Sequence, residues 1–449
     1  MRKIIPLFLT GAALMAAPKK TALDHYVAKA DPAYKYKLIQ SQKVRGGTIH
    51  VIDMTSQRYL TRKEVNRPEW RHWVIIVKPD QVKHQTGLLY IGGGNNDGKP
   101  PRPRGELMQI AAATGSVVTE IQMVPNQPLV FADETRQRYE DAIIAYSWDK
   151  FLRGGDEKWP LRLPMTKAAV RALDTVTDFM ASAKGGGIKV DRFVVTGASK
   201  RGWTTWSTAI VDKRVVAIIP IVIDMLNIEP SFKHHKAAYG FYAPAVGDYT
   251  AKGVMNWIDT PQNTKLKIIE DPYEYRDRLT LPKFCINSAG DQFFLPDSWQ
   301  FYWDDLRGPK HIRYVPNTGH GLRNSDAIDS LAAFYHAILN KTDLPRYDWK
   351  VAKDGTITAT TQDKPKAVRL WQVTNPDARD FRIDQIKNKW TATELKLNKK
   401  GQYTARPKNP AKGWTAYLIE LTFPGKVRPF KFTSGVVVRP DVLPFADKK

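Results

Sequence analysis

Short apolar runs alternate with amphipathic segments through the central part of this chain. The runs have the length of buried strands and lie at residues 73–77, 87–91, 116–124, 193–196, 215–223, 283–287 and 311–315. The segments carry apolar residues three and four positions apart, which predicts helices at residues 134–152, 166–184 and 325–339. Strands that alternate with helices build a mostly parallel sheet, so the pattern predicts an α/β fold.

The strand pattern lapses between residues 225 and 281. Aromatic residues are frequent in this stretch: Tyr239, Phe241, Tyr242, Tyr249, Trp257, Tyr273 and Tyr275. An insertion after a strand of such a sheet lies naturally over the pocket, and loops at strand ends carry function. We therefore predict a cap over residues 225–281. The same aromatic side chains could form the core of a helical subdomain, and both descriptions can hold together.

The pattern changes again after Pro345. Residues 350–359, 367–373 and 414–422 alternate apolar and polar side chains, and glycine and proline interrupt the chain repeatedly. This is typical of short antiparallel strands joined by turns. The sequence thus predicts an α/β domain over residues 18–345, followed by a small all-β sandwich over residues 346–449.

The amino terminus has the features of a secretory signal peptide. Arg2 and Lys3 are basic, a short apolar core follows, and Ala16 and Ala17 are small. The core is shorter than the about 20 residues that a membrane-spanning helix needs. We predict a signal peptide over residues 1–17, a secreted or periplasmic protein, and no membrane span in the mature chain. Pro18 disfavours cleavage directly before it, so the cut can fall one residue earlier, and an uncleaved anchor is the alternative.

The chain is strongly basic, with 69 Lys and Arg against 45 Asp and Glu and a formal net charge of +24. Such a charge favours acidic partners, including nucleic acid, anionic lipid and acidic glycans. The basic residues are spread along the chain and not gathered into tracts, which favours a solvated surface. We therefore predict no specific nucleic-acid partner. Cys285 is the only cysteine, which excludes an intrachain disulfide.

The sequence GASKRG at residues 197–202 joins a predicted strand to a helix that starts near Trp203. A serine among small residues at such a turn is typical of the nucleophile elbow of serine hydrolases. The second glycine comes one residue later than in G-x-S-x-G, and Arg201 takes its usual place. A cation here can bind a carboxylate or stabilise developing negative charge, so Arg201 is a candidate for substrate binding. Asn95, at the end of the glycine loop at residues 92–94, is the other candidate. Alternatively, Lys200 and Arg201 point to solvent or pair with acids.

A nucleophilic Ser199 needs a base, and the base needs a carboxylate that fixes its tautomer. His320 is the strongest candidate for the base, because it lies on a glycine-flanked loop after the last predicted strand. Asp291 follows the strand before it, on a glycine-containing turn. We prefer Asp291 as the acid to Asp224, which ends an earlier strand, and to Asp297. The order Ser199, Asp291, His320 is that of α/β-hydrolases.

A tetrahedral intermediate carries an oxyanion, which two backbone N–H groups can hold. Lys200 supplies one of them as the residue after the nucleophile. We expect the other from the glycine loop after residues 87–91, at Gly93 or Gly94. The loop could instead cradle a phosphate, but it lacks the spacing of the phosphate-binding motifs. No HExxH motif or Cys/His set indicates a metal, and we predict no cofactor.

Five longer stretches resemble the PhoPQ-activated pathogenicity-related protein family of bacteria. They are MVPNQP at 123–128, EDAIIAY at 140–146, PMTK at 164–167, GASKRGWTTW at 197–206 and RDFR at 379–382. The resemblance spans nearly the whole mature chain. It implies an α/β-hydrolase-like domain, export, and a link to virulence regulation and the bacterial envelope, and it implies a functional role for Ser199 alone. The elbow is also similar to that of glucuronoyl methylesterases, which place a basic residue after the serine.

These patterns together predict a secreted or periplasmic serine hydrolase that cleaves an ester or amide through an acyl-enzyme. Its substrate would be a small molecule or a polymer, and an acidic envelope or glycan substrate is among the candidates. The alternative is a non-catalytic envelope protein on a hydrolase scaffold, which holds anionic polymers through its positive charge.

Overall fold

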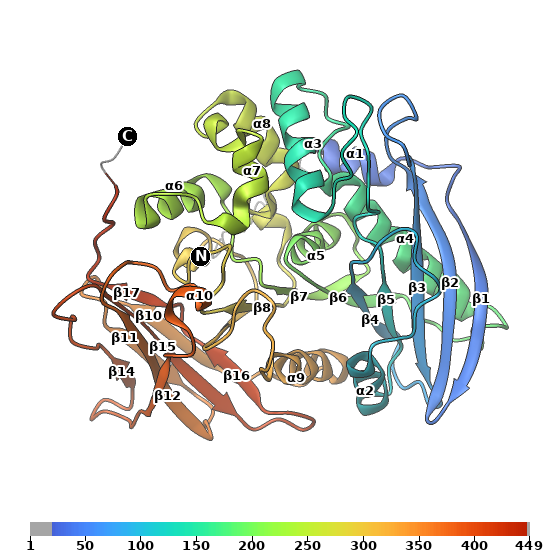
Figure 1. The fold of residues 1–449 in the computed structure, drawn as a ribbon. Helices are drawn as coiled ribbons and strands as arrows, with labels where there is room; N and C mark the ends of the chain where they lie inside the picture. Colours follow the sequence, from blue (N-terminus) through green and yellow to red (C-terminus); the bar gives the residue numbers. More distant parts are fainter. Residues whose placement is uncertain (1–19, 447–449) are drawn as a thin grey trace, which may run out of the picture.

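A computed structural model describes residues 20–446, and a nine-stranded sheet lies at its centre (Figure 1). The strands are β1 (Lys35–Val44), β2 (Gly47–Arg58), β3 (Glu69–Pro79), β4 (Thr86–Ile91), β5 (Val118–Ile121), β6 (Arg192–Ala198), β7 (Val215–Ile221), β8 (Lys283–Ser288) and β9 (Lys310–Val315). Their order across the sheet is β1-β2-β3-β5-β4-β6-β7-β8-β9. The first three strands pair antiparallel, and the six from β5 to β9 run parallel. The predicted mostly parallel sheet is confirmed.

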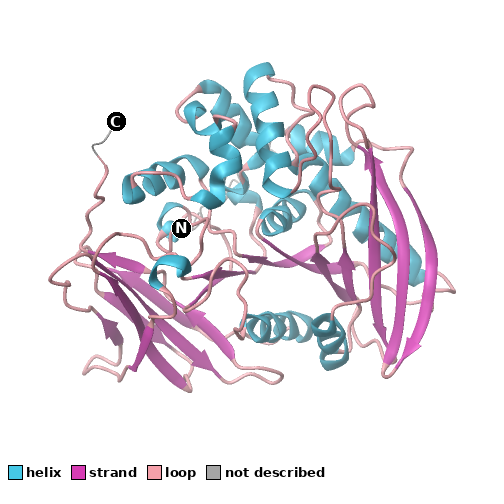
Figure 2. Cartoon of the chain, in the orientation of Figure 1, coloured by secondary structure: helices cyan, strands magenta, loops and turns pink. Residues whose placement is uncertain are grey.

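Helices cover both faces of this sheet (Figure 2). One face carries α3 (Glu140–Gly154), α4 (Arg162–Ala181) and α5 (Lys200–Val211), and the short α1 (Ala22–Ala28) packs on α4. The other face carries α2 (Gly105–Thr114) and α9 (Ala327–Asn340). Successive residues of β6 face opposite ways: Val195 packs with the first layer and Val194 with the second. Strands buried on both faces are continuous apolar runs, which is why the sequence predicts them.

The chain between β7 and β8 forms an insertion of short helices. They are α6 (Ile228–Tyr239), η1 (Pro244–Val246), α7 (Gly247–Ala251), η2 (Val254–Trp257), α8 (Pro261–Glu270) and η3 (Pro272–Arg278). Figure 1 shows them beside α3, on the same side of the sheet as α5. The ring of Tyr249 packs on that of Trp148, with centroids 5.3 Å apart. Tyr249 and Tyr275 of the stretch predicted as a cap therefore belong to the hydrophobic core on this side, and Tyr242, Trp257 and Tyr273 pack against it. Tyr239 lies in a separate small cluster, and Phe241 is exposed.

Residues 347–439 form two antiparallel sheets. One contains β10 (Tyr347–Val351), β11 (Ile357–Thr361) and β14 (Tyr403–Ala405). The other contains β12 (Ala367–Asn375), β13 (Thr391–Glu394), β15 (Trp414–Phe423), β16 (Phe430–Thr433) and β17 (Val437–Arg439). Both sheets contribute to one apolar cluster, Ile357 from the first and Ile419 from the second. The predicted all-β sandwich is confirmed, and Phe432 packs it on Phe284 of β8 at 5.3 Å between centroids.

Several predicted boundaries differ from the structure; for example, α4 begins at Arg162 and not at residue 166, and β7 ends at Ile221 and not at residue 223. Two of the differences have a local cause. β5 ends at Ile121 and not at residue 124, because Met123 has φ 64°, which no strand residue adopts. α3 begins at Glu140 and not at residue 134, because Arg138 instead pairs with Leu129 in an isolated bridge. The predicted signal peptide lies outside the described residues. Among residues 20–446, no helix has the length and apolar character needed to cross a membrane.

Candidate active site

Ser199 occupies the sharp turn between β6 and α5. Its backbone has φ 58° and ψ −128°, which side chains rarely adopt and which costs on the order of 1–3 kcal/mol. A Cβ at Gly202 would lie 2.9 Å from the carbonyl oxygens of Gly197 and Ile221, so only glycine fits there. The displaced second glycine therefore meets the packing requirement of this turn. The geometry is that of a nucleophile elbow.

The structure brings Asp291 and His320 together from the loops that follow β8 and β9. Nδ1 of His320 lies 2.9 Å from each carboxylate oxygen of Asp291, which is buried. The ring of Phe293 packs on the imidazole, with centroids 4.3 Å apart. Nε2 of His320 has no hydrogen-bond partner among the described residues, and none joins it to Ser199. The carboxylate thus fixes the ring and leaves Nε2 available to act as a base.

Asp224, the second candidate for the acid, lies in a different environment. Its carboxylate is buried and accepts hydrogen bonds from the hydroxyls of Tyr302 at 2.5 Å and Tyr314 at 2.6 Å. Burial raises the pKa of Asp224 to about 7, against the lowering effect of the two tyrosines. In the described part of the chain it makes no hydrogen bond to His320, which Asp291 already holds.

Asp297, the third candidate, is also committed to other partners. It forms an ion pair with Arg379 at 2.5 Å and a hydrogen bond with Nε2 of His234 at 3.0 Å. Although burial would raise the pKa of Asp297, these two partners hold it well below its usual range. No group of three or more His, Cys, Asp or Glu side chains in residues 20–446 is arranged to hold a metal ion.

The glycine loop that follows β4 offers backbone donors. The carbonyl of Gly93 accepts a hydrogen bond from the N–H of Met123 at 2.9 Å, which fixes the loop to the segment after β5. The N–H groups of Gly93 and Gly94 donate no hydrogen bond within the described residues. The guanidinium of Arg201 packs against Gly93 and so ties the loop to the start of α5. Asn95 follows on the loop and is exposed.

Lys200 and Arg201 both form ion pairs close to the elbow. Nζ of Lys200 lies 2.8 Å from Glu140 and 3.0 Å from Asp141, and Nη2 of Arg201 lies 2.5 Å from Glu140. Burial alone would raise the pKa of Glu140, but the two cations hold it at about 2. Nε of Arg201 also donates to the carbonyl of Val124 at 2.6 Å. This pairing favours the interpretation that both residues pair with acids, and it places Arg201 as a support of the loop.

Sequence reasoning missed a second charged pair beneath the elbow. Arg162 and Glu270 are both almost completely buried, and their closest side-chain atoms lie 3.3 Å apart. Nη1 of Arg162 donates to the carbonyl of Lys200 at 2.6 Å and to the hydroxyl of Thr204 at 3.1 Å. The pair thus supports the first turn of α5 from below. Nothing in the sequence indicates it, because its members are 108 positions apart.

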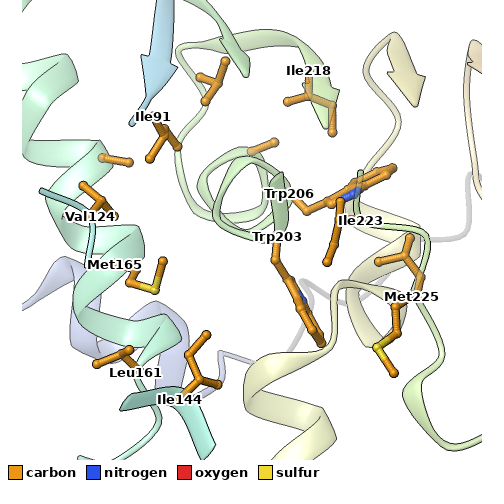
Figure 3. Packing of buried hydrophobic residues seen from close by; sticks show 14 of the residues in the cluster. Ile91, Val124, Ile144, Leu161, Met165, Trp203, Trp206, Ile218, Ile223 and Met225 are labelled. Atoms are coloured by element: carbon orange, nitrogen blue, oxygen red, sulfur yellow. The ribbon is translucent and has the colours of Figure 1, made fainter. Parts of the chain in front are cut away.

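A small cavity lies beside Ser199, and a wider groove lies beside His320. The cavity has a volume of about 30 Å³ and is lined by Asp141, Ile144, Trp148, Arg162, Ser199, Lys200, Trp203, Ile223, Met225, Phe232, Val246, Tyr249, Phe293 and Phe294. In Figure 3 the ring of Trp203 extends away from α5 between Ile144 and Met225. The groove has a volume of about 350 Å³, and Ala198 and His320 both line it. The elbow and the base therefore stand between two spaces of different size.

Residues 379–390 reach from the β-sandwich to the loops that carry Asp291 and His320. The N–H of Ile383 donates to the carbonyl of Gly290 at 2.9 Å, directly before Asp291. Asn317, three residues before the base, exchanges two hydrogen bonds of 3.0 Å with the backbone of Trp390. The position of the acid and of the base therefore depends on the carboxyl-terminal part of the chain.

Replacing Gly290 by alanine is expected to disturb the site through this contact. The new Cβ would lie 2.6 Å from the carbonyl oxygen of Thr318 and 3.2 Å from Cβ of Ile383, so the backbone before Asp291 must shift. We expect a loss of about 1–3 kcal/mol in unfolding free energy and a 10- to 100-fold loss in kcat/KM. Gly154→Ala is the matched control, because a Cβ there meets nothing within 4 Å. Equal activities of the two variants would contradict the positioning role.

Comparison with known proteins places the chain in context. A family model described as PhoPQ-activated pathogenicity-related protein matches residues 23–382. Autocrine proliferation repressor protein A of Dictyostelium discoideum is 36% identical over 99% of this chain and 95% of its own length. The solved structure of an acetyl xylan esterase from Paenibacillus sp. R4 matches with a TM-score of 0.50 and 15% identity, over 71% of this chain and 92% of that one. This last likeness shows an α/β-hydrolase fold.

Proposed function

The chain belongs to the PhoPQ-activated pathogenicity-related protein family, and we propose that it is a serine hydrolase that cleaves an ester or amide. The observation that carries the proposal is the bond from His320 to Asp291, which leaves Nε2 without a partner. Ser199 stands at a strained elbow, and Ala198 beside it lines the same groove as His320. Catalytic hydrogen bonds are often long in the absence of substrate, so Ser199 and His320 are expected to join when it binds.

In the proposed reaction, Ser199 Oγ bonds to the carbonyl carbon of the substrate while His320 Nε2 takes its proton. The bond to the leaving group then breaks, and His320 returns the proton to the departing oxygen or nitrogen. Water then attacks the carbonyl carbon of the acyl-enzyme while His320 takes a proton from it. The bond to Ser199 Oγ breaks, and His320 returns the proton to Oγ. The N–H groups of Lys200 and of Gly93 or Gly94 hold the oxyanion in both halves.

Labelling with a fluorophosphonate tests the nucleophile directly. This probe forms a covalent bond with an activated serine hydroxyl, so wild type should gain one adduct, found on the peptide that contains Ser199. Denatured wild type is the control for reaction with ordinary serines. Equal labelling of wild type and Ser199→Ala would remove Ser199 from this role.

The name of the Dictyostelium relative supports a second candidate function. That protein is named a repressor of proliferation and not a hydrolase, so a binding role without catalysis is the second candidate for this chain. The net charge of +24 would favour binding to anionic polymers. Binding that survives Ser199→Ala and weakens steeply with salt would favour this candidate over a hydrolase. Because Lys200 and Arg201 are paired with carboxylates, an acidic substrate is supported only by the overall charge.

The proposal includes export from the cytoplasm. It also includes a role in virulence at the bacterial envelope, and the words "pathogenicity-related" in the family description support the link to virulence. The basic start, the short apolar core and the small residues before Pro18 support a cleaved signal peptide. Expression of the full chain in a bacterium is expected to give a periplasmic or secreted protein that begins at Pro18 or Ala17. Amino-terminal sequencing measures this, and a mature protein that begins at Met1 would contradict cleavage.

A further inference from the structure

The cavity beside Ser199 is small and closed by large side chains. Its volume of about 30 Å³ gives room for two or three water molecules, at roughly 10–15 Å³ each. Trp148, Trp203 and Phe232 are buried walls, and Phe232 comes from the insertion between β7 and β8. The rings of Trp148 and Trp203 pack edge to face, with centroids 6.2 Å apart. Only a group with very few non-hydrogen atoms fits without moving these side chains.

The charges around this cavity balance. Its charged lining residues are Arg162, Lys200 and Asp141, and each of them is paired. With Arg201, which lies behind the lining, the three cations of this region have three carboxylates as partners. The carboxylates are those of Glu140, Asp141 and Glu270. Asp141 additionally accepts a hydrogen bond from the hydroxyl of Tyr249 at 2.9 Å. A charged group entering the cavity would find no unpaired opposite charge, and burying it there would be costly.

The groove on the side of His320 has a different character. It is about ten times larger, it is open, and its lining is largely apolar, with Tyr90, Leu107 and Leu331 among its residues. In the proposed reaction Nε2 of His320 delivers the proton to the leaving oxygen. Nε2 itself is buried, but His320 lines the groove, so we assign the alcohol to the groove. The acyl group must lie on the other side of the reacting carbon, where Ser199 and Lys200 line the small cavity.

We propose that the enzyme takes esters of short, uncharged acyl groups, of about acetyl size, with larger apolar alcohols. The cavity holds the acyl group and the groove holds the alcohol. This inference rests on the proposed hydrolase function, because it assigns the two spaces to the two parts of an ester.

Two isomeric esters test the assignment on the intact wild-type protein. Hexyl acetate and ethyl hexanoate have the same atoms, but the short and long chains are exchanged between acyl group and alcohol. A single extra methylene in an apolar pocket changes kcat/KM by about 10- to 200-fold. We therefore expect hexyl acetate to be hydrolysed with a kcat/KM about 100-fold or more above that of ethyl hexanoate. Hexyl glycinate, whose acyl group carries a charge, should be as poor as ethyl hexanoate.

A pair of methionine variants locates the selectivity. Met225→Ala enlarges the cavity and should reduce the preference for hexyl acetate about 10-fold. Met180→Ala is the control. Met180 is also apolar and buried, but it lies near the carboxyl end of α4, whereas Arg162 at the other end of α4 lines the cavity. Equal rates for the two isomers, or a preference for ethyl hexanoate or hexyl glycinate, would overturn the assignment of the two spaces, but the proposed hydrolase function would stand. If the protein hydrolyses none of these esters and is not labelled by the fluorophosphonate, both the assignment and the hydrolase function are overturned.

Discussion

Replacing Ser199 by alanine is expected to lower kcat/KM by about 10⁴- to 10⁶-fold on any ester that the wild type hydrolyses. Without the hydroxyl no acyl-enzyme forms, and only the oxyanion donors and the binding spaces remain. Initial rates at saturating and limiting substrate measure the loss. The fold should survive, because the side chain of Ser199 makes no hydrogen bond within the described residues. A residual activity within tenfold of wild type would show that another group is the nucleophile.

A glycine at the same position separates the chemistry from the strain. Ser199→Gly should be as inactive as Ser199→Ala, but more stable than it by about 1 kcal/mol, because φ 58° is strained for alanine and not for glycine. Urea unfolding of the two variants measures the difference. If the two variants unfold at the same urea concentration, the backbone at residue 199 is not strained, and the elbow costs the protein no stability.

Much of the fold is readable from the sequence where strands are buried on both faces. β6 is one example, because Val194 and Val195 pack on opposite layers and leave an uninterrupted apolar run. β1 shows why other elements escape prediction. Most of its residues are exposed, and it is held by antiparallel pairing with β2. A strand at the edge of a sheet needs no apolar run, so its sequence lacks the signal that reveals a central strand.

The candidate site was predictable as far as local turns and chain order reach. Ser199, Asp291 and His320 each follow a predicted strand, and the carboxyl ends of parallel strands meet at one edge of the sheet. Long-range partners were not predictable. Glu140 forms an ion pair with Lys200, which is 60 positions away in the sequence, and Trp390 forms hydrogen bonds with Asn317, which is 73 positions away. Such contacts depend on tertiary packing, and no spacing rule connects their members.

Replacing Asp291 by asparagine is expected to lower kcat by about 10⁴-fold, while stability falls far less. The carboxylate accepts a hydrogen bond from the N–H group at Nδ1 of His320 and so keeps Nε2 unprotonated for the attack. An asparagine amide can donate to Nδ1 instead, which favours the tautomer that carries its proton on Nε2. Rates with hexyl acetate measure the loss. Fluorophosphonate labelling should slow in parallel, because activation of Ser199 depends on the same base.

Asp224→Asn is the matched control, since Asp224 is equally buried and was the competing candidate for the acid. Its activity should stay within tenfold of wild type, because Tyr302 and Tyr314 hold it instead of His320. Its effect should appear in stability. The pKa of Asp224 is about 7 in the folded protein, above the ordinary 3.8, so the folded state binds this proton more tightly than the unfolded state does. The protonated carboxyl therefore stabilises the folded protein at low pH, and this stabilisation is lost as pH rises from about 4 to 7. The variant should therefore gain stability relative to wild type over that interval, measured by urea unfolding. A collapse of kcat in Asp224→Asn with full activity in Asp291→Asn would exchange the roles of the two carboxylates.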